Sequence, residues 1–215
     1  MLPSLRGGQT LLPMKPRLIP VVLALAQLAS TPLSGQVPAE SLLVHLPLTN
    51  DLKDHSPSQH WVTVSGKVSL REGAAYFRGQ RVWLELPHLP LNDRAFAVGF
   101  WVRLTGDHPI YGLVEQRAAR GRNQHFHLML RGQLQPRLGF YLNDIVSPVP
   151  VANGKQWTHM LFQYTGTRQQ IWINGRLIVE RTARPYGGTS GKTYIGRNPR
   201  WRNVPARDFE GYMSD

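Results

Sequence analysis

His125 and His127 are the residues whose type and spacing come closest to a metal site in this sequence. At alternate positions of an extended strand both imidazoles lie on one face, where they could bind zinc. Phe126, Leu128 and Leu130 make the opposite face apolar. This alternation already accounts for the histidines as the polar face of a half-buried strand, and no third ligand can be assigned. We therefore favour the structural interpretation.

Asp54, His55 and Ser56 have the residue types of a hydrolytic triad. Immediate neighbours in a chain cannot form the triad geometry, in which each group orients the next in space. The surrounding stretch is rich in Asn, Asp, Ser and Pro, which predicts a loop. His159 follows Trp157 among core-type residues, and we predict a buried histidine whose ring is satisfied by a neighbouring strand or turn.

The stretch 156–180 predicts three consecutive antiparallel strands that organise the rest of the chain. Its first strand has large side chains on both faces, so it should lie inside a packed sheet. The chain then reverses at 165–167. The second strand ends at Asn174 and Gly175, the pair that best suits the two positive-φ positions of a type I′ hairpin.

No window of residues 40–215 sustains helical periodicity, and short apolar runs separated by turn residues recur along it. We predict a single all-β domain, a two-sheet antiparallel β-sandwich whose inner faces pack about 10 Å apart. The remaining predicted strands are 41–48, 61–64, 68–70, 74–77, 82–86, 95–104, 110–116, 124–131 and 134–142.

Residues 1–39 have the pattern of a signal peptide followed by a short polar leader. Lys15 and Arg17 precede the apolar run 18–29, which is shorter than the roughly 20 residues that span a bilayer. Met14 is an alternative start. We predict export to the periplasm, cell surface or medium after cleavage, without a stable membrane span; an uncleaved membrane anchor is the alternative.

Composition limits the partners. The formal net charge is +12, and only three of the 25 basic residues belong to the predicted leader. Nucleic acid is a common partner of basic chains, yet here the basic residues are scattered and export is predicted, so an anionic polysaccharide is more consistent. The sequence has no cysteine, so the stability of an exported protein must come from its sheet core.

Arginines gather in irregular stretches between the predicted strands. An arginine fork matches sulfate and carboxylate oxygens, and an exposed tryptophan offers a flat face to a sugar ring. In the alternative interpretation, which stays open, the arginines only keep the protein soluble and the tryptophan packs beneath its loop. The predicted ligand-binding residues are Arg117, Arg120, Arg122, Tyr186, Arg200, Trp201 and Arg202.

Five motifs, in the required order, resemble those of laminin-G-like domains within the concanavalin A-like lectin/glucanase jelly rolls. The resemblance covers residues 41–215 and implies a jelly-roll β-sandwich. The family normally continues beyond the acid that corresponds to Asp215 with a further strand. The motifs are 73–87, 96–102, Trp157-x-His159 with the following run into Asn174-Gly175, 194–197 and 209–215.

Some members of the family that the sequence resembles are glucanases, and a retaining enzyme needs two carboxylates about 5–5.5 Å apart. Glu85, Glu115 and Asp144 each stand alone in the sequence. Asp208 and Glu210 form the alternate pair, but we interpret them as solvent-facing charges on an edge strand. The prediction is therefore a domain without catalysis.

Calcium is the cofactor that the resemblance implies, because many laminin-G-like domains bind it through loop carboxylates and carbonyl oxygens. The candidate ligands here are Asn50, Asp51 and Asp54, with Asp215 at the position that resembles the family's closing acid. The alternative is that Asn50 and Asp51 only cap a turn.

Three functions remain open at this stage. The favoured one is a secreted, non-catalytic module that binds an acidic polysaccharide or a glycoprotein glycan, or acts in adhesion. The others are a glycoside-active enzyme and a truncated structural jelly roll with no ligand of its own. The oligomeric state is not predicted.

Overall fold

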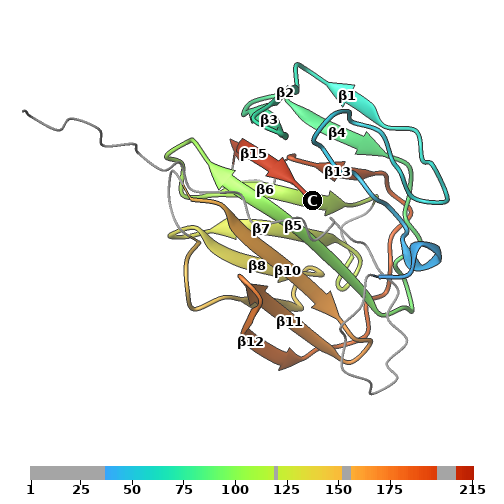
Figure 1. Ribbon diagram of the computed structural model, residues 1–215. Coiled ribbons are helices and arrows are strands. Elements are labelled where there is room, and N and C mark those ends of the chain that lie inside the picture. Colours follow the sequence, from blue (N-terminus) through green and yellow to red (C-terminus); the bar gives the residue numbers. More distant parts are fainter. Residues whose placement is uncertain (1–36, 119–120, 152–155, 198–206) are drawn as a thin grey trace, which may run out of the picture.

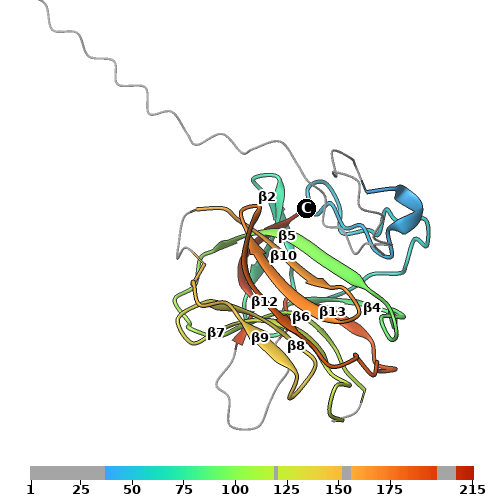
Figure 2. The ribbon, with the colours of Figure 1, turned by 90° about the horizontal axis from the view of Figure 1, so that it is seen from below.

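Residues 37–118, 121–151, 156–197 and 207–215 are described by the computed structural model and form two sheets packed face to face (Figure 1). Figure 2 shows the sheets as separate layers, with β5 and β10 in one and β7 and β8 in the other. The predicted all-β, two-sheet sandwich is confirmed. The division into a leader (1–39) and one domain (40–215) stays a prediction.

Both sheets are antiparallel apart from the short parallel pair β14–β6. The seven-stranded sheet has the order β12 (Arg176–Thr182), β11 (Arg168–Ile173), β10 (Thr158–Tyr164), β5 (Phe96–Leu104), β15 (Glu210–Ser214), β3 (Ala74–Arg78) and β2 (Ser69–Arg71). The eight-stranded sheet has the order β1 (Thr63–Ser65), β4 (Trp83–Leu86), β13 (Thr193–Ile195), β6 (Tyr111–Gln116), β7 (Phe126–Arg131), β8 (Gln135–Gly139) and β9 (Asp144–Val146), with β14 (Arg207–Asp208) beside β6.

The predicted hairpin between β11 and β12 is confirmed. Asn174 and Gly175 have φ values of 50° and 78°, as a type I′ turn requires. The Asn174 side chain also fixes the turn to β10, because its Oδ1 accepts a hydrogen bond of 2.9 Å from the His159 N–H.

The segment 41–48 is not the strand that the sequence predicts. It follows a short 3₁₀-helix, Ala39–Ser41, and its apolar side chains still enter the core. Its backbone is held from the side instead, since the His45 N–H donates to Asp54 Oδ1 and the His45 carbonyl accepts from His55. Leu48 then has a φ of 57°, which extended strands do not adopt. Val44, Leu46 and Leu48 are buried at alternate positions, as in a strand, although the segment is not one.

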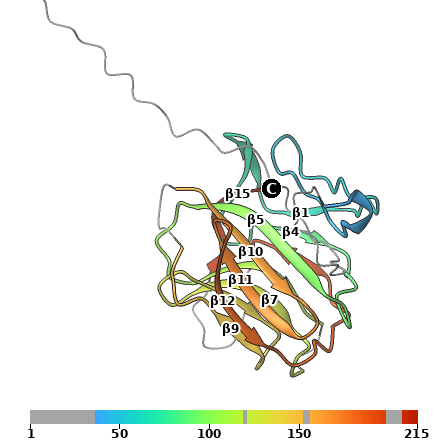
Figure 3. The ribbon, with the colours of Figure 1, turned by 60° about the horizontal axis from the view of Figure 1, so that its bottom comes forward.

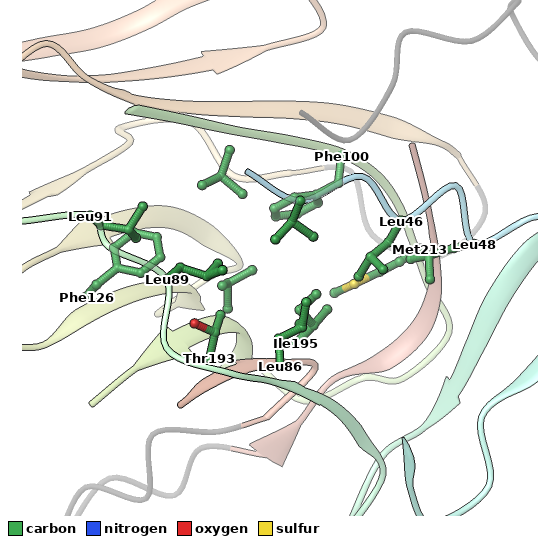
Figure 4. Close-up of a pocket in the computed structure, with 13 residues that line it drawn as sticks. Leu46, Leu48, Leu86, Leu89, Leu91, Phe100, Phe126, Thr193, Ile195 and Met213 are labelled. Carbon is green, nitrogen blue, oxygen red and sulfur yellow. The ribbon is translucent and has the colours of Figure 1, made fainter. Parts of the chain in front are cut away.

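The core between the sheets is tightly packed around aromatic rings, and Phe140 stacks on Tyr186 at 4.5 Å between ring centroids. One apolar cavity of about 40 Å³ lies where Leu46 and Leu48 meet both sheets, and the Thr193 hydroxyl is the one polar side-chain group in its lining (Figure 4). A cavity of this size and lining stays dry and is too small for a sugar ring.

Among the described residues, no helix is long and apolar enough to cross a membrane. The predicted signal peptide lies almost entirely in residues 1–36, outside the described part.

Candidate functional site

Three loops meet at one end of the sandwich and form what we call the three-loop surface: residues 117–124, of which 119 and 120 are not described, 140–143 and 183–191. Backbone hydrogen bonds join them. The Asn123 N–H donates to the Tyr141 carbonyl at 3.1 Å, and the Gly187 N–H donates to the Asn123 carbonyl at 2.9 Å. The Ala118 N–H donates to Thr189 Oγ1 at 2.9 Å. Segments far apart in sequence thus present one continuous surface.

The structure brings two of the predicted ligand-binding residues to this surface. Arg117 is half-buried and Arg122 is exposed, both in the first loop, and Arg184 of the third loop is exposed beside them. Tyr186 was wrongly predicted: it is 1% exposed and packs in the core against Phe140. The other predicted residues, Arg120, Arg200, Trp201 and Arg202, lie outside the described part of the chain.

The second loop is a strained turn that the sequence analysis missed. Tyr141 and Leu142 have φ values of 67° and 59°, the positive values of the two central residues in a type I′ turn, although neither is Asn or Gly. The Phe140 N–H donates to the Asn143 carbonyl across the turn at 3.1 Å. The left-handed conformation costs a residue with a side chain about 1–2 kcal/mol. Both apolar side chains point outward, with 37% of Tyr141 and 66% of Leu142 exposed.

Hydrogen bonds of Asn143 hold this turn in place. It is buried, its Nδ2 donates to the Arg184 carbonyl at 2.9 Å, and its Oδ1 accepts from Arg181 Nη2 at 3.0 Å. Its carbonyl accepts from Gln169 Nε2 at 3.0 Å. Strained conformations persist where surrounding contacts over-determine them, and they gather at functional sites. The strained turn leaves an aromatic and an aliphatic side chain exposed.

A row of polar side chains crosses the outer face of the eight-stranded sheet. Glu115 on β6 pairs with His127 on β7, which pairs with Gly139 on β8, which pairs with Asp144 on β9. His127 Nε2 lies 3.6 Å from Asp144 Oδ1, and His125 Nε2 lies 3.6 Å from Glu115 Oε2. Glu115 and Asp144 stand alone in the sequence, but sheet register places them in one row, with β7 and β8 between them.

This row is built as a buried polar network. Glu115, His125 and His127 are buried rather than half-buried. Burial, and then the charges of His125 and Arg137, hold the pKa of His127 well below its usual 6.5. A Cβ atom on Gly139 would lie less than 3.0 Å from His127 Nε2 and from Asp144 Oδ1, so only glycine leaves room for both groups.

Each carboxylate of the row also has an arginine partner. Arg137 Nη2 donates to Asp144 Oδ2 at 2.6 Å, and Arg197 Nε lies 3.6 Å from Glu115 Oε1. No group of three or more His, Cys, Asp or Glu residues that could hold a metal ion occurs in the described ranges. The carboxylates of the row are thus each paired with an arginine.

Glu210 does not lie on an edge strand as predicted, and Asp208, on the short strand β14 beside β6, does not face solvent. β15, which begins at Glu210, lies between β5 and β3 inside its sheet. Asp208 is buried, and its Oδ2 accepts a hydrogen bond of 2.7 Å from the Arg81 N–H. The sequence could not show this role because the partner is more than a hundred residues away.

The predicted calcium ligands do not fit a common site built on Asp54. Both oxygens of this buried carboxylate accept internal hydrogen bonds, Oδ1 from the N–H groups of His45 and Ser56 and Oδ2 from His60 at 2.7 Å. Burial alone would raise the pKa of Asp54, but these donors together hold it below 3.8. Asp215 Oδ2 lies 3.1 Å from His45 Nε2.

The two other predicted calcium ligands lie nearer the surface. Asp51 Oδ1 accepts from the Lys53 N–H at 3.0 Å and lies 3.0 Å from His55 Nε2, while Asn50 is exposed. Asn50 and Asp51 are therefore the predicted ligands that an ion could reach most easily, and calcium stays a prediction. Ser56 Oγ donates to Asp54 Oδ2, in keeping with a loop rather than a triad.

The sequence profile described as the concanavalin A-like lectin/glucanases superfamily matches residues 78–215. The chain belongs to this superfamily. The resemblance seen in the sequence is thereby confirmed, and the two-sheet architecture agrees with it. A search of curated protein sequences finds no match to this superfamily member.

Solved structures share the fold at low sequence identity. Domain 4 of AbnA, a GH43 extracellular arabinanase from Geobacillus stearothermophilus, in complex with arabinotriose, has a TM-score of 0.60 at 20% identity, over 80% of this chain and 88% of that one. The binding domain of botulinum neurotoxin DC in complex with SialylT has a TM-score of 0.60 at 16% identity, over 82% and 48%. The Ruminococcus gnavus IT-sialidase CBM40 bound to alpha2,3 sialyllactose has a TM-score of 0.50 at 14% identity, over 69% and 91%.

Proposed function

We propose that this superfamily member is a secreted, non-catalytic carbohydrate-binding module whose three-loop surface binds an acidic glycan. The observation that carries the proposal is the strained turn, which holds Tyr141 and Leu142 outward beside Arg122 and Arg184. A soluble protein gains nothing in stability from an exposed Leu142 in a left-handed conformation, so a binding role explains the cost.

The charge of the surface favours an anionic ligand. The three loops contain four arginines and no Asp or Glu in their sequence. Guanidinium groups can bind the carboxylate or sulfate of a glycan through paired hydrogen bonds, and the Tyr141 ring offers a face to the apolar side of a sugar. Loops on a rigid sandwich are a common place for such sites.

Two further observations support binding without catalysis. Glu115 is buried and Asp144 is held by Arg137, so this pair of acids is enclosed rather than open to a substrate. Some structures that share the fold are complexes with a saccharide, such as arabinotriose or sialyllactose. The proposal extends that chemistry to this chain.

Affinity chromatography and calorimetry on heparin and alginate oligosaccharides test the proposal. We expect retention at low ionic strength that weakens steeply with salt, because exposed ion pairs are screened over about 8 Å at physiological ionic strength. Arg122→Ala and Tyr141→Ala should each weaken binding several-fold. Arg71→Ala, a change of an exposed arginine on β2 in the other sheet, is the matched control and should leave it unchanged.

The proposal is wrong if neither polymer binds at low ionic strength. It is also wrong if Arg71→Ala weakens binding as much as Arg122→Ala, because binding would then follow net charge alone.

A further inference from the structure

The outer face of the seven-stranded sheet carries large aromatic side chains where a solvent-facing sheet is usually polar. On β10, Met160 and Phe162 point into the core, so His159 and Leu161, which alternate with them, point outward. Trp101 on β5 lies opposite His159, and Trp172 on β11 lies opposite Leu161. Figures 1 and 3 show these three strands side by side on one face.

We call Trp101, His159, Leu161, Gln163 and Trp172 the sheet-face patch. Its members are half-buried, except that His159 is just within the buried range. The patch is continuous: the rings of Trp101 and His159 are 5.1 Å apart between centroids, and Gly99 lies opposite Leu161 without a side chain to separate the two rows.

The patch holds hydrogen-bonding groups that the protein does not use. Within the described ranges, no hydrogen bond involves the Trp101 indole N–H, the His159 ring or the Gln163 side-chain amide, whereas Trp172 Nε1 donates to Gln170 Oε1 at 3.4 Å. Burial lowers the pKa of His159, so its ring is neutral at pH 7 and has one donor and one acceptor. The neighbouring turn bonds His159 through its backbone N–H, which donates to Asn174 Oδ1, and leaves the ring without a hydrogen-bond partner in the described ranges.

The charges around the patch are paired with one another. Arg168 Nη2 lies 2.7 Å from Glu180 Oε1 at one border. At the other, Arg103 donates to Glu72 at 2.6 Å and its guanidinium lies 4.2 Å from the centre of the Tyr212 ring. The centre of the patch is therefore apolar with neutral hydrogen-bonding groups, unlike the arginine-rich three-loop surface.

We infer that the sheet-face patch is a second binding site, which takes an uncharged oligosaccharide lying across β5, β10 and β11. Sugars have apolar C–H faces and a rim of hydroxyls. The indoles of Trp101 and Trp172 match the faces, and His159 and Gln163 match the hydroxyls. Neighbouring strands lie about 4.8 Å apart and each residue along a strand adds about 3.4 Å. Trp101 and Trp172, two strands and two residues apart, are therefore separated by about 12 Å, the scale of a short oligosaccharide.

A calorimetric titration of the full chain with neutral oligosaccharides tests this inference, using arabinotriose, xylotetraose and cellotetraose as probes. We expect at least one to bind with an affinity that changes less than twofold between 50 and 500 mM salt, as an order-of-magnitude expectation for an uncharged ligand. Trp172→Ala should weaken binding about tenfold or more, in line with stacking on a large aromatic ring. Gln163→Ala, at a half-buried surface amide, should weaken it several-fold without affecting folding.

Two controls separate this site from the three-loop surface. Trp61→Ala removes a tryptophan that is 83% exposed outside the patch and should leave binding unchanged. Arg122→Ala should weaken acidic-glycan binding several-fold while sparing the neutral probes, so either proposal can fail alone. The inference is overturned if no neutral probe binds, or if binding persists in the folded Gln163→Ala and Trp172→Ala variants.

Discussion

Gly139→Ala is predicted to destabilise the fold through a single methyl group. The new Cβ would lie less than 3.0 Å from His127 Nε2 and Asp144 Oδ1, and His127 has no exposed surface through which to move away. Overpacking of this kind costs about 1–3 kcal/mol. Gly139 does not have a positive φ, so without the clash alanine would stabilise the protein by about 0.4–1 kcal/mol, because it lowers the conformational entropy of the unfolded chain.

With an overpacking cost at the upper end of its range, the two effects together lower the free energy of unfolding by about 2 kcal/mol. For a protein of this size the melting temperature should fall by about 4–8 °C, measured by differential scanning calorimetry. Gly187→Ala is the matched control, because a Cβ there meets neighbours at ordinary distances of 3.4 Å and beyond.

A double-mutant cycle assigns the cause. In a His127→Ala background the clash with the imidazole is gone, so the cost of Gly139→Ala should shrink markedly. An unchanged melting temperature for Gly139→Ala, or an equal cost in both backgrounds, would refute the account of a packed polar row.

Three further predictions concern single groups. Gly175→Val should cost about 1–2 kcal/mol through its positive φ alone, because nothing lies within 4 Å of the new Cβ; an unchanged melting curve would exclude strain at this turn. The folded state holds the pKa of His127 well below 6.5 and the unfolded state does not, so the free energy of unfolding should fall as the pH drops below 6.5. Urea titrations at about pH 5–7 measure this dependence, which should be weaker in His127→Gln. Calcium that binds only the folded state, at about a hundredfold excess over Kd, would add about 2.7 kcal/mol to the free energy of unfolding. Millimolar calcium should therefore raise the melting temperature relative to chelator in the wild type but not in Asp51→Ala. Identical wild-type curves with calcium and with chelator would exclude a calcium site.

Local patterns in the sequence predicted much of the sandwich. Alternation along β10 and the Asn174-Gly175 pair are properties of neighbouring residues, and both predictions are confirmed. The turn at Tyr141 and Leu142 was hidden because its apolar residues continue the pattern of β8, so residues 134–142 were predicted as one strand. The turn is held by contacts of Asn143 with Gln169, Arg181 and Arg184, which are distant in the sequence.

Features that depend on sheet register could not be found from one sequence. Glu115 and Asp144 share a row because β6, β7, β8 and β9 pair in a particular alignment, and nothing local to either acid indicates it. Tyr186 lies among Pro and Gly residues that predict a loop tip, yet its ring fills a space between the sheets that other segments create.

The position of β15 has a consequence for the time at which this protein can fold. β15 lies between β3 and β5 in the middle of its sheet (Figure 1), although β5 ends at Leu104 and β15 begins at Glu210. While the ribosome makes the intervening 100 or so residues, which takes about 5–20 s, β2 and β3 remain separated from β5, β10, β11 and β12. The sheet closes only when β15 emerges, and a nascent chain that stays open this long would suit translocation in the unfolded state.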